Sequence, residues 1–168
     1  MTISMYSASV PALERALGAL DAILDKAAVY AEERGIDPTV LTSARLAPDM
    51  HPLNRQVQLV SDTAKGACAR LAGLPVPSFE DTETTFPELK SRIAKTRAFM
   101  AGIRPEQIDG SEERDIVLKA GASEFRFKGQ DYLASFVLPN FYFHVTAAYA
   151  ILRHNGVPLG KRDYLAGI

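Results

Sequence analysis

The segment from Pro139 to Gly156 constrains the fold more than any other part of the chain. A proline near its start and an Asn-Gly pair at its end are the usual punctuation of an α-helix. At about 100° per residue, one side of this helix collects small and apolar residues together with a single histidine. A histidine that points into a core needs a hydrogen-bond partner or a metal ion. The stripe expected to face the core is Asn140, His144, Ala147 and Ile151, and the opposite stripe is Tyr142, Thr146, Tyr149 and Arg153.

Three earlier stretches have the apolar spacing of amphipathic helices. The first, residues 9–34, has Ser9 as its expected N-cap, and the second covers residues 50–72. The third, residues 85–102, begins with a Thr-x-x-Glu capping box and ends at a glycine. Together with the last helix, these stretches predict a bundle of four main helices.

Residues 115–128 have a different pattern. Phe125 and Phe127 alternate with charged residues, which is the period of a half-buried strand, and Gly121 marks a turn before them. We therefore expect a small β-hairpin inserted before the last helix. The predicted fold class is mainly all-α, with helix over more than half of the chain.

Length and composition favour one soluble domain over residues 1–168, with 47% hydrophobic and 23% charged residues. The net charge of -1 gives no basic excess, so nucleic acid is not an expected partner. No apolar run approaches the ~20 residues that span a bilayer, and the start of the chain does not resemble a signal peptide. A cytoplasmic location is therefore expected. The single cysteine, Cys68, excludes a disulfide within the chain and is expected to be a buried thiol.

Several short motifs together resemble a bacterial family of unknown function that belongs to the DinB/YfiT-like superfamily of metalloenzymes. The resemblance covers nearly the whole chain and is most specific in the last helix. The motifs are Ala47-Pro-Asp-Met50, Arg55-Gln-Val57, Ala69-Arg-Leu-Ala-Gly73, Pro139-Asn-Phe-Tyr-Phe-His144, Leu152-Arg-His-Asn-Gly156 and Gly160-Lys161 with Asp163 and Leu165.

The resemblance implies a DinB-like four-helix bundle of up-down-down-up type, often a homodimer. Relatives include thiol-dependent transferases and isomerases, and many bind a divalent metal through three histidines. One of these histidines comes from the second main helix, and two lie four residues apart on the last helix. His144 matches the first of the latter pair, but Ala148 stands four residues later, and His51 precedes the second helix.

A metal site in this chain would need His144 and two further ligands. The candidates are Asn140, one turn before His144, and His51, Gln56 and Asp49 near the start of the second main helix. Such a mixed nitrogen and oxygen set suits Zn, Ni or Mn. The alternative is that His144 is a structural histidine, hydrogen-bonded within the protein.

The remaining histidine is not expected to join this site. His154 follows His144 by ten residues, which corresponds to roughly 15 Å along a helix. Its place in the last turn suits a cation that interacts with the helix dipole.

Two functional hypotheses follow. In the first, the protein is a metal-dependent hydrolase or transferase with a degenerate histidine site. In the second, it is a non-catalytic dimeric binding or scaffold protein that has lost the metal site. Tyr142 and Tyr149 face away from the expected core, and Tyr is favoured at interfaces, so they are the expected dimer contacts. A small-molecule ligand is compatible with either hypothesis, and the substrate and reaction stay open.

Overall fold

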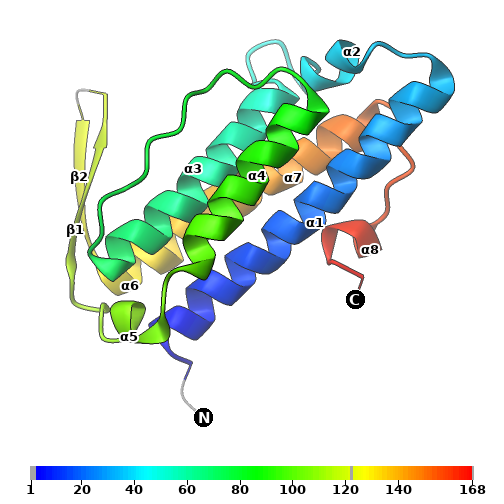
Figure 1. The fold of residues 1–168 in the computed structure, drawn as a ribbon. Helices are drawn as coiled ribbons and strands as arrows, with labels where there is room; N and C mark the ends of the chain where they lie inside the picture. The colour runs from blue at the N-terminus through cyan, green and yellow to red at the C-terminus, as the bar shows by residue number, and fades with distance from the viewer. Residues whose placement is uncertain (1–2, 122, 168) are drawn as a thin grey trace.

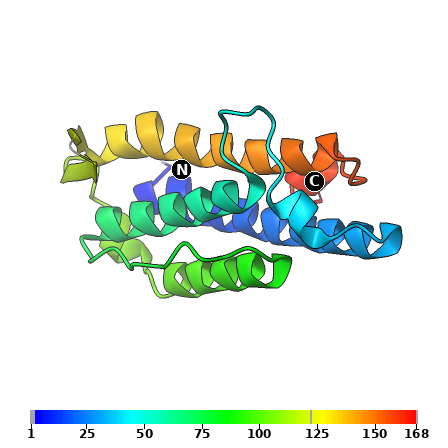
Figure 2. The same cartoon turned by 90° about the horizontal axis from the view of Figure 1, so that it is seen from above.

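Four long helices lie side by side and form the body of the molecule, as Figures 1 and 2 show. The structure is a computed structural model that describes residues 3–121 and 123–167. The first and last long helices run in one direction and the two between them run in the other, which is the predicted up-down-down-up order. The long helices are α1 (Met5–Arg34), α3 (Leu53–Ala72), α4 (Phe86–Ala101) and α7 (Leu138–His154).

The ends of these helices follow from local capping. Ser4 caps α1 and forms a capping box with Ser7, so this helix begins four residues before the predicted cap, Ser9. Ser9 lies inside α1 instead, and its hydroxyl donates to the carbonyl of Met5 at 2.6 Å. Gly35 ends α1 with φ of 62°, the left-handed conformation that glycine adopts without strain.

The connection between α3 and α4 runs back along the bundle. Because these two helices point the same way, residues 74–85 must cross its length, as Figure 1 shows. The predicted capping box at the start of α4 is confirmed, since the Glu88 carboxylate accepts from the Thr85 backbone N–H at 2.9 Å. The short helix α2 (Pro38–Thr42) precedes α3 and packs on α1.

The predicted hairpin is confirmed between the short helix α5 (Pro105–Ile108) and the last helical run. Strands β1 (Asp115–Ala120) and β2 (Ser123–Lys128) pair antiparallel, with Ile116 opposite Phe127. Phe127 packs against Tyr132 and Phe136, with ring centroids 5.8 Å away in each case. Phe127 thereby attaches the hairpin to the last helical run, and Ile116 opposite it is buried in the core.

The last helical run is continuous past Pro139. It passes from α6 (Gly129–Asp131) through a π-helical turn, η1 (Tyr132–Val137), into α7. Pro139 stands in the first turn of α7, directly after this π-helical turn, and the run continues through it, so the proline does not separate two helices. By length and composition alone, Gly129–His154 is apolar enough to cross a membrane. This is weak evidence, because core helices of soluble proteins share that property, and 44% of its apolar window is buried inside the bundle.

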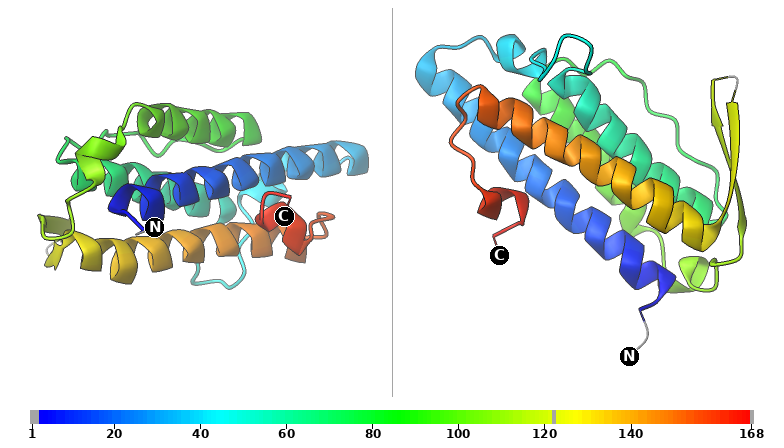
Figure 3. Two further views of the ribbon diagram at one scale, coloured as in Figure 1. Left: turned by 90° about the horizontal axis from the view of Figure 1, so that it is seen from below. Right: turned by 180° about the vertical axis from the view of Figure 1, so that it is seen from behind.

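The core runs along the inner faces of the four long helices, and the chain is 64% helix and 7% strand. The C-terminal segment with α8 (Lys161–Tyr164) folds back across α1 and α7, as the rear view in Figure 3 shows. Tyr164 packs against Tyr149 with ring centroids 5.9 Å apart. Tyr149, one of the two tyrosines expected as dimer contacts, therefore already has an aromatic partner within the chain. Fully buried core side chains include Leu13, Leu17, Leu20, Leu53, Val57, Leu71, Leu89, Ile93, Phe141 and Ile151.

The junction between hairpin and last helix yields a stability prediction. A β-carbon at Gly129 would lie 1.9 Å from the Ser111 carbonyl oxygen, so Gly129→Ala forces the two backbone segments apart. We expect it to lower the free energy of unfolding by about 1–3 kcal/mol in urea denaturation. The control Gly18→Ala places its β-carbon 3.9 Å from the mobile end of Arg97 and should stabilise the helix by up to about 1 kcal/mol. Equal effects of the two substitutions would contradict the close approach at Gly129.

Candidate functional site

His144 lies on the face of α7 that packs against α3, as its position in the sequence predicts. The side chain is only 9% exposed, and its Nδ1 atom is 2.7 Å from Oε1 of Gln56 on α3. The amide nitrogen of Gln56 donates in turn to the backbone carbonyl of His51 at 3.0 Å. This second bond turns the Gln56 oxygen toward His144, so Nδ1 of His144 carries the proton and donates it. Nε2 is then the unprotonated nitrogen of a neutral imidazole.

The surroundings of His144 favour this neutral form. Burial lowers the pKa of the imidazole below its ordinary value of 6.5, and the nearby charges of His51 and Arg55 lower it further. No hydrogen-bond partner for Nε2 is found within residues 3–121 and 123–167. In His144, Nδ1 is therefore engaged by Gln56, whereas the lone pair of Nε2 can accept a hydrogen bond or bind a metal.

Asn140 shares this side of α7 but has a different partner. Its amide nitrogen donates to the Thr63 hydroxyl at 2.9 Å, and that hydroxyl donates to the Leu59 carbonyl at 2.7 Å. The amide thus forms a second polar link between α7 and α3. It is Gln56, rather than Asn140, that hydrogen-bonds the imidazole of His144.

The other predicted ligands, His51 and Asp49, are exposed in the loop before α3. His154, which is not expected to join the site, is exposed in the last turn of α7. Within the described residues, no three His, Cys, Asp or Glu side chains come close enough together to hold a metal ion. With Gln56 bonded to His144 and Asn140 bonded to Thr63, this donor set does not fit a closed site for Zn, Ni or Mn.

A network of charged side chains that the sequence did not predict lies on the other side of α3. The sequence indicates only a surface pair of Asp62 and Lys65, and these two are paired at 2.9 Å, but Lys65 is buried. Asp62 also binds Arg92 of α4 at 2.7 Å, and the Arg92 side chain is only 1% exposed. The network contains three cations and three carboxylates, namely Arg55, Lys65, Arg92, Asp62, Asp81 and Glu83.

This network attaches the crossing loop to the bundle. The Arg92 guanidinium lies 3.0 Å from a carboxylate oxygen of Asp81 and 3.1 Å from one of Glu83, and both residues belong to the loop. Gln58 of α3 donates to Glu83 at 3.0 Å. The available sequence signal was the acidic run 80–83 placed between two helices with cationic polar faces. Balanced, hydrogen-bonded charges of this kind indicate a structural role.

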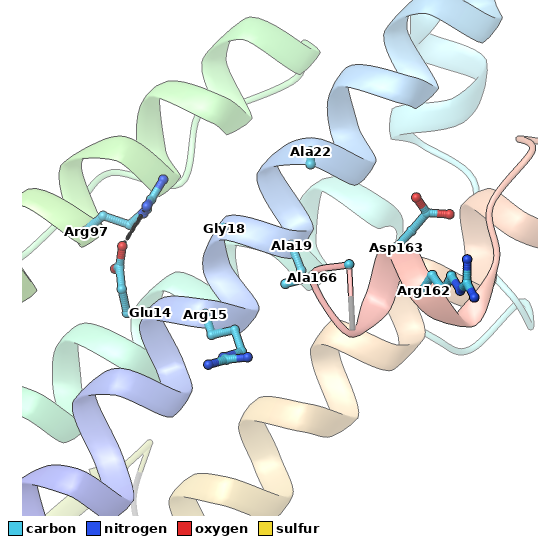
Figure 4. A pocket seen from close by; sticks show the side chains of 10 residues that line it. Glu14, Arg15, Gly18, Ala19, Ala22, Arg97, Arg162, Asp163 and Ala166 are labelled. Carbon is cyan, nitrogen blue, oxygen red and sulfur yellow. Dashed lines mark hydrogen bonds and ion pairs between the residues drawn. The ribbon is translucent and has the colours of Figure 1, made fainter.

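Cys68 and a groove beside α1 lie apart from the predicted site residues, none of which lines that groove. Burial raises the pKa of the Cys68 thiol to about 12, so it is an inert core group. A groove with a volume of 490 Å³ runs beside α1, from Arg97 of α4 to the C-terminal segment. Figure 4 shows residues that line it, among them Arg97 and Glu14, which are paired at 2.6 Å. Asp163 on its opposite wall is paired with Lys26, also at 2.6 Å. Most of its charges are therefore already neutralised within the chain.

The first prediction for the site concerns stability. His144→Ala leaves the buried amide oxygen of Gln56 without its partner and should lower the free energy of unfolding by about 1–3 kcal/mol. His154→Ala, at an exposed position on the same helix, should change it by less than about 0.5 kcal/mol. Chemical denaturation followed by circular dichroism measures both values. Two equally mild substitutions would mean that the His144–Gln56 contact does not stabilise the fold.

The second prediction concerns pH. As the pH falls below 6.5, the unfolded chain protonates this histidine before the folded chain does, because the pKa of His144 is lowered in the fold. The stability contributed by the neutral imidazole is complete above pH 6.5 and is lost as the pH falls through the lowered pKa. His144→Gln removes the titrating group, so its free energy of unfolding should fall less steeply with decreasing pH than that of the wild type. Parallel curves would contradict the lowered pKa.

Comparison with known proteins places this geometry in a family. Residues 5–165 match a family model described as a domain of unknown function, DUF1993. A crystal structure of a DinB family member from Shewanella denitrificans is similar, with a TM-score of 0.86 and 39% sequence identity over 95% of this chain and 90% of that chain. No curated protein matches the sequence. The chain therefore belongs to the DUF1993 family, a DinB-like family of unknown function.

Proposed function

We propose that the protein is a non-catalytic, dimeric binding or scaffold protein of the DinB-like fold. The observation that carries this proposal is the chain of hydrogen bonds from His144 through Gln56 to the His51 carbonyl. Gln56, a candidate metal ligand, is therefore already hydrogen-bonded within the protein, and Asn140 is likewise hydrogen-bonded to Thr63. In this function His144 fixes the position of α7 on α3 rather than taking part in a reaction.

A metal-dependent hydrolase or transferase is the second candidate, and one specific observation favours it. Histidines that bind metals usually donate their other ring nitrogen to an oxygen, which fixes the ring and its tautomer. His144 is held in this way by Gln56, and its Nε2 is left without a partner in the described part of the chain. The weakness of this candidate is the absence of two further suitable donors beside Nε2 among those residues.

Metal analysis separates the two candidates. Protein purified without an affinity tag should contain less than stoichiometric Zn, Ni and Mn, and added Zn²⁺ should not raise its melting temperature. His51→Ala/His144→Ala is the matched control for any Zn²⁺ effect, since it removes both imidazoles of the candidate site. A stoichiometric metal that the wild type retains and the double variant loses would overturn the proposal in favour of the metalloenzyme.

The dimer is proposed on an apolar surface beside His144. Leu46 and Met50 from the loop before α3 and Tyr142, Phe143 and Ala147 from α7 line a hollow of 400 Å³. Phe143 is 57% exposed at its edge, which is unusual for a large aromatic side chain. A protruding ring beside an apolar hollow is self-complementary, as a two-fold symmetric interface requires. Because Tyr149 packs on Tyr164, we place the interface at Tyr142 and Phe143 rather than at Tyr149.

Light scattering tests this interface. The wild type should have about twice the chain mass of 18.3 kDa at micromolar concentration, and Phe143→Lys should shift it toward the monomer because it places a charge in the apolar contact. Phe125→Lys is the matched control, since Phe125 is 48% exposed on the distant hairpin. A monomeric wild type, or equal effects of the two substitutions, would remove the dimer from the proposal.

A further inference from the structure

A cavity lies at the end of the bundle where α1 ends, α2 packs against it and α4 begins. Its volume is 650 Å³, within the range of about 300–1,000 Å³ that is usual for small-molecule sites. None of its lining residues belongs to α3 or α7, the helices that carry Gln56 and His144. The apolar residues that line it are Ala28, Ala31, Ile36, Pro38, Phe86 and Pro87.

The space exists because of the sequence of α1. Ala28 and Ala31 of α1 and its C-cap, Gly35, are small residues that line the cavity, so at these three positions no long side chain fills it. Gly35 then ends the helix in the left-handed conformation, and the chain turns into α2 with Ile36 and Pro38 on the wall. Phe86, which is buried in the first turn of α4, adds an aromatic surface.

The charged residues around the cavity are of one sign. Glu32 and Asp37 line it, and no Lys, Arg or His is found among the described residues that do so. The Asp37 carboxylate accepts from the Thr39 backbone N–H at 2.9 Å, and this bond lowers the pKa of the carboxyl group, so Asp37 is charged at neutral pH. The carbonyl end of α1 and the amino end of α4 both lie here, so the two helix dipoles oppose each other and the two carboxylates supply the net charge. The cavity therefore combines apolar walls with a net negative charge.

We infer that this cavity binds a small organic cation, a protonated amine carried on a compact apolar body. The apolar body would pack on Ile36, Pro38 and Phe86, and the ammonium group would lie toward the carboxylates of Glu32 and Asp37. An anion of the same shape is repelled by both carboxylates, and a neutral molecule lacks the electrostatic attraction. This inference goes beyond the proposed function and does not depend on His144 or on dimerisation.

The direct test uses two probes of similar shape and opposite charge. 2-Phenylethylammonium and 3-phenylpropionate are titrated into ¹⁵N-labelled protein, and backbone amide shifts are followed by NMR. We expect the cation to bind with saturable shifts that centre on Ala28, Ala31 and Ile36, and we expect the binding to weaken at higher salt. Equal binding of the carboxylate, no saturable binding of the cation, or shifts centred on another surface would each overturn the inference.

Two pairs of variants test the two halves of the recognition. Glu32→Gln should weaken binding of 2-phenylethylammonium by roughly two- to fivefold, the size expected for a partly exposed ion pair, while Glu33→Gln on the same turn should not. Ala28→Leu fills the cavity and should weaken binding by about tenfold or more, whereas Val29→Leu, at an exposed neighbouring position, should leave it unchanged. If circular dichroism shows that Ala28→Leu does not fold, the comparison of Glu32→Gln with Glu33→Gln alone decides the inference. Equal affinities within that pair would refute the role of the carboxylates.

Discussion

The contact between α3 and α7 is the constraint on which the rest of the structure depends. It is the most extensive helix pair of the bundle, and two side-chain hydrogen bonds cross it, from His144 to Gln56 and from Asn140 to Thr63. Each bond contributes only about 1 kcal/mol net, but leaving its buried partner unsatisfied costs about 1–3 kcal/mol. A helix shifted by one turn would lose both bonds. The two bonds therefore fix the register of α7 on α3, and the apolar residues around them supply most of the free energy of burial.

The same contact occupies the positions where the DinB/YfiT-like resemblance implies metal-binding histidines. Ala148 is fully buried in the helix face next to His144, where its methyl group packs in the core. Gln56 supplies from α3 a side chain that bonds the imidazole directly and is itself bonded to the chain before the helix. His144 thus has the hydrogen-bond partner that a histidine buried in a core requires. Fold and function vary independently, so the DinB-like fold does not by itself assign a metal site to this chain.

The up-down-down-up order places a second demand on the chain. Two neighbouring helices that point the same way require a long connection, and long loops without secondary structure are uncommon in compact domains. Here Arg92 holds the loop through Asp81 and Glu83, while Asp62 and Lys65 continue the network onto α3. Three cations balance three carboxylates, so no buried charge is left without a counter-charge in this network. The two middle helices can therefore run in parallel without a loose segment between them.

Local signals were sufficient to predict the helices, most of their ends, the hairpin and the inward direction of His144. Capping residues and a fixed angle per residue act over a few positions, so a single sequence contains them. The error at Ser9 came from a competing local signal, since Ser4 and Ser7 form a complete capping box. In contrast, the choice of Gln56 rather than Asn140 as the partner of His144 depends on the rotation and register of two helices. Periodicity does not determine these quantities.

The burial of Lys65 and the contact between Tyr149 and Tyr164 were missed for the same reason. Lys65 lies over the ring of Phe79 from the crossing loop, and Tyr149 packs on Tyr164 from the C-terminal segment, so both depend on segments that follow later in the sequence. Periodicity alone predicts that a polar stripe or an outward-facing tyrosine is exposed, even when such a segment covers it in the folded protein. Tertiary contacts of this kind decide whether a residue that is polar in sequence is a surface residue or part of a buried network.

The tautomer of His144 is the most direct measure of its role. A long-range ¹H–¹⁵N correlation spectrum distinguishes protonated from unprotonated ring nitrogens at about pH 7, where a neutral imidazole is expected. The hydrogen bond to Gln56 predicts a neutral ring with the proton on Nδ1, and a structural role predicts that an equimolar amount of Zn²⁺ leaves the spectrum of His144 unchanged. A proton on Nε2, or a Zn²⁺-induced shift of that nitrogen, would contradict the structural role and return His144 to the list of metal ligands.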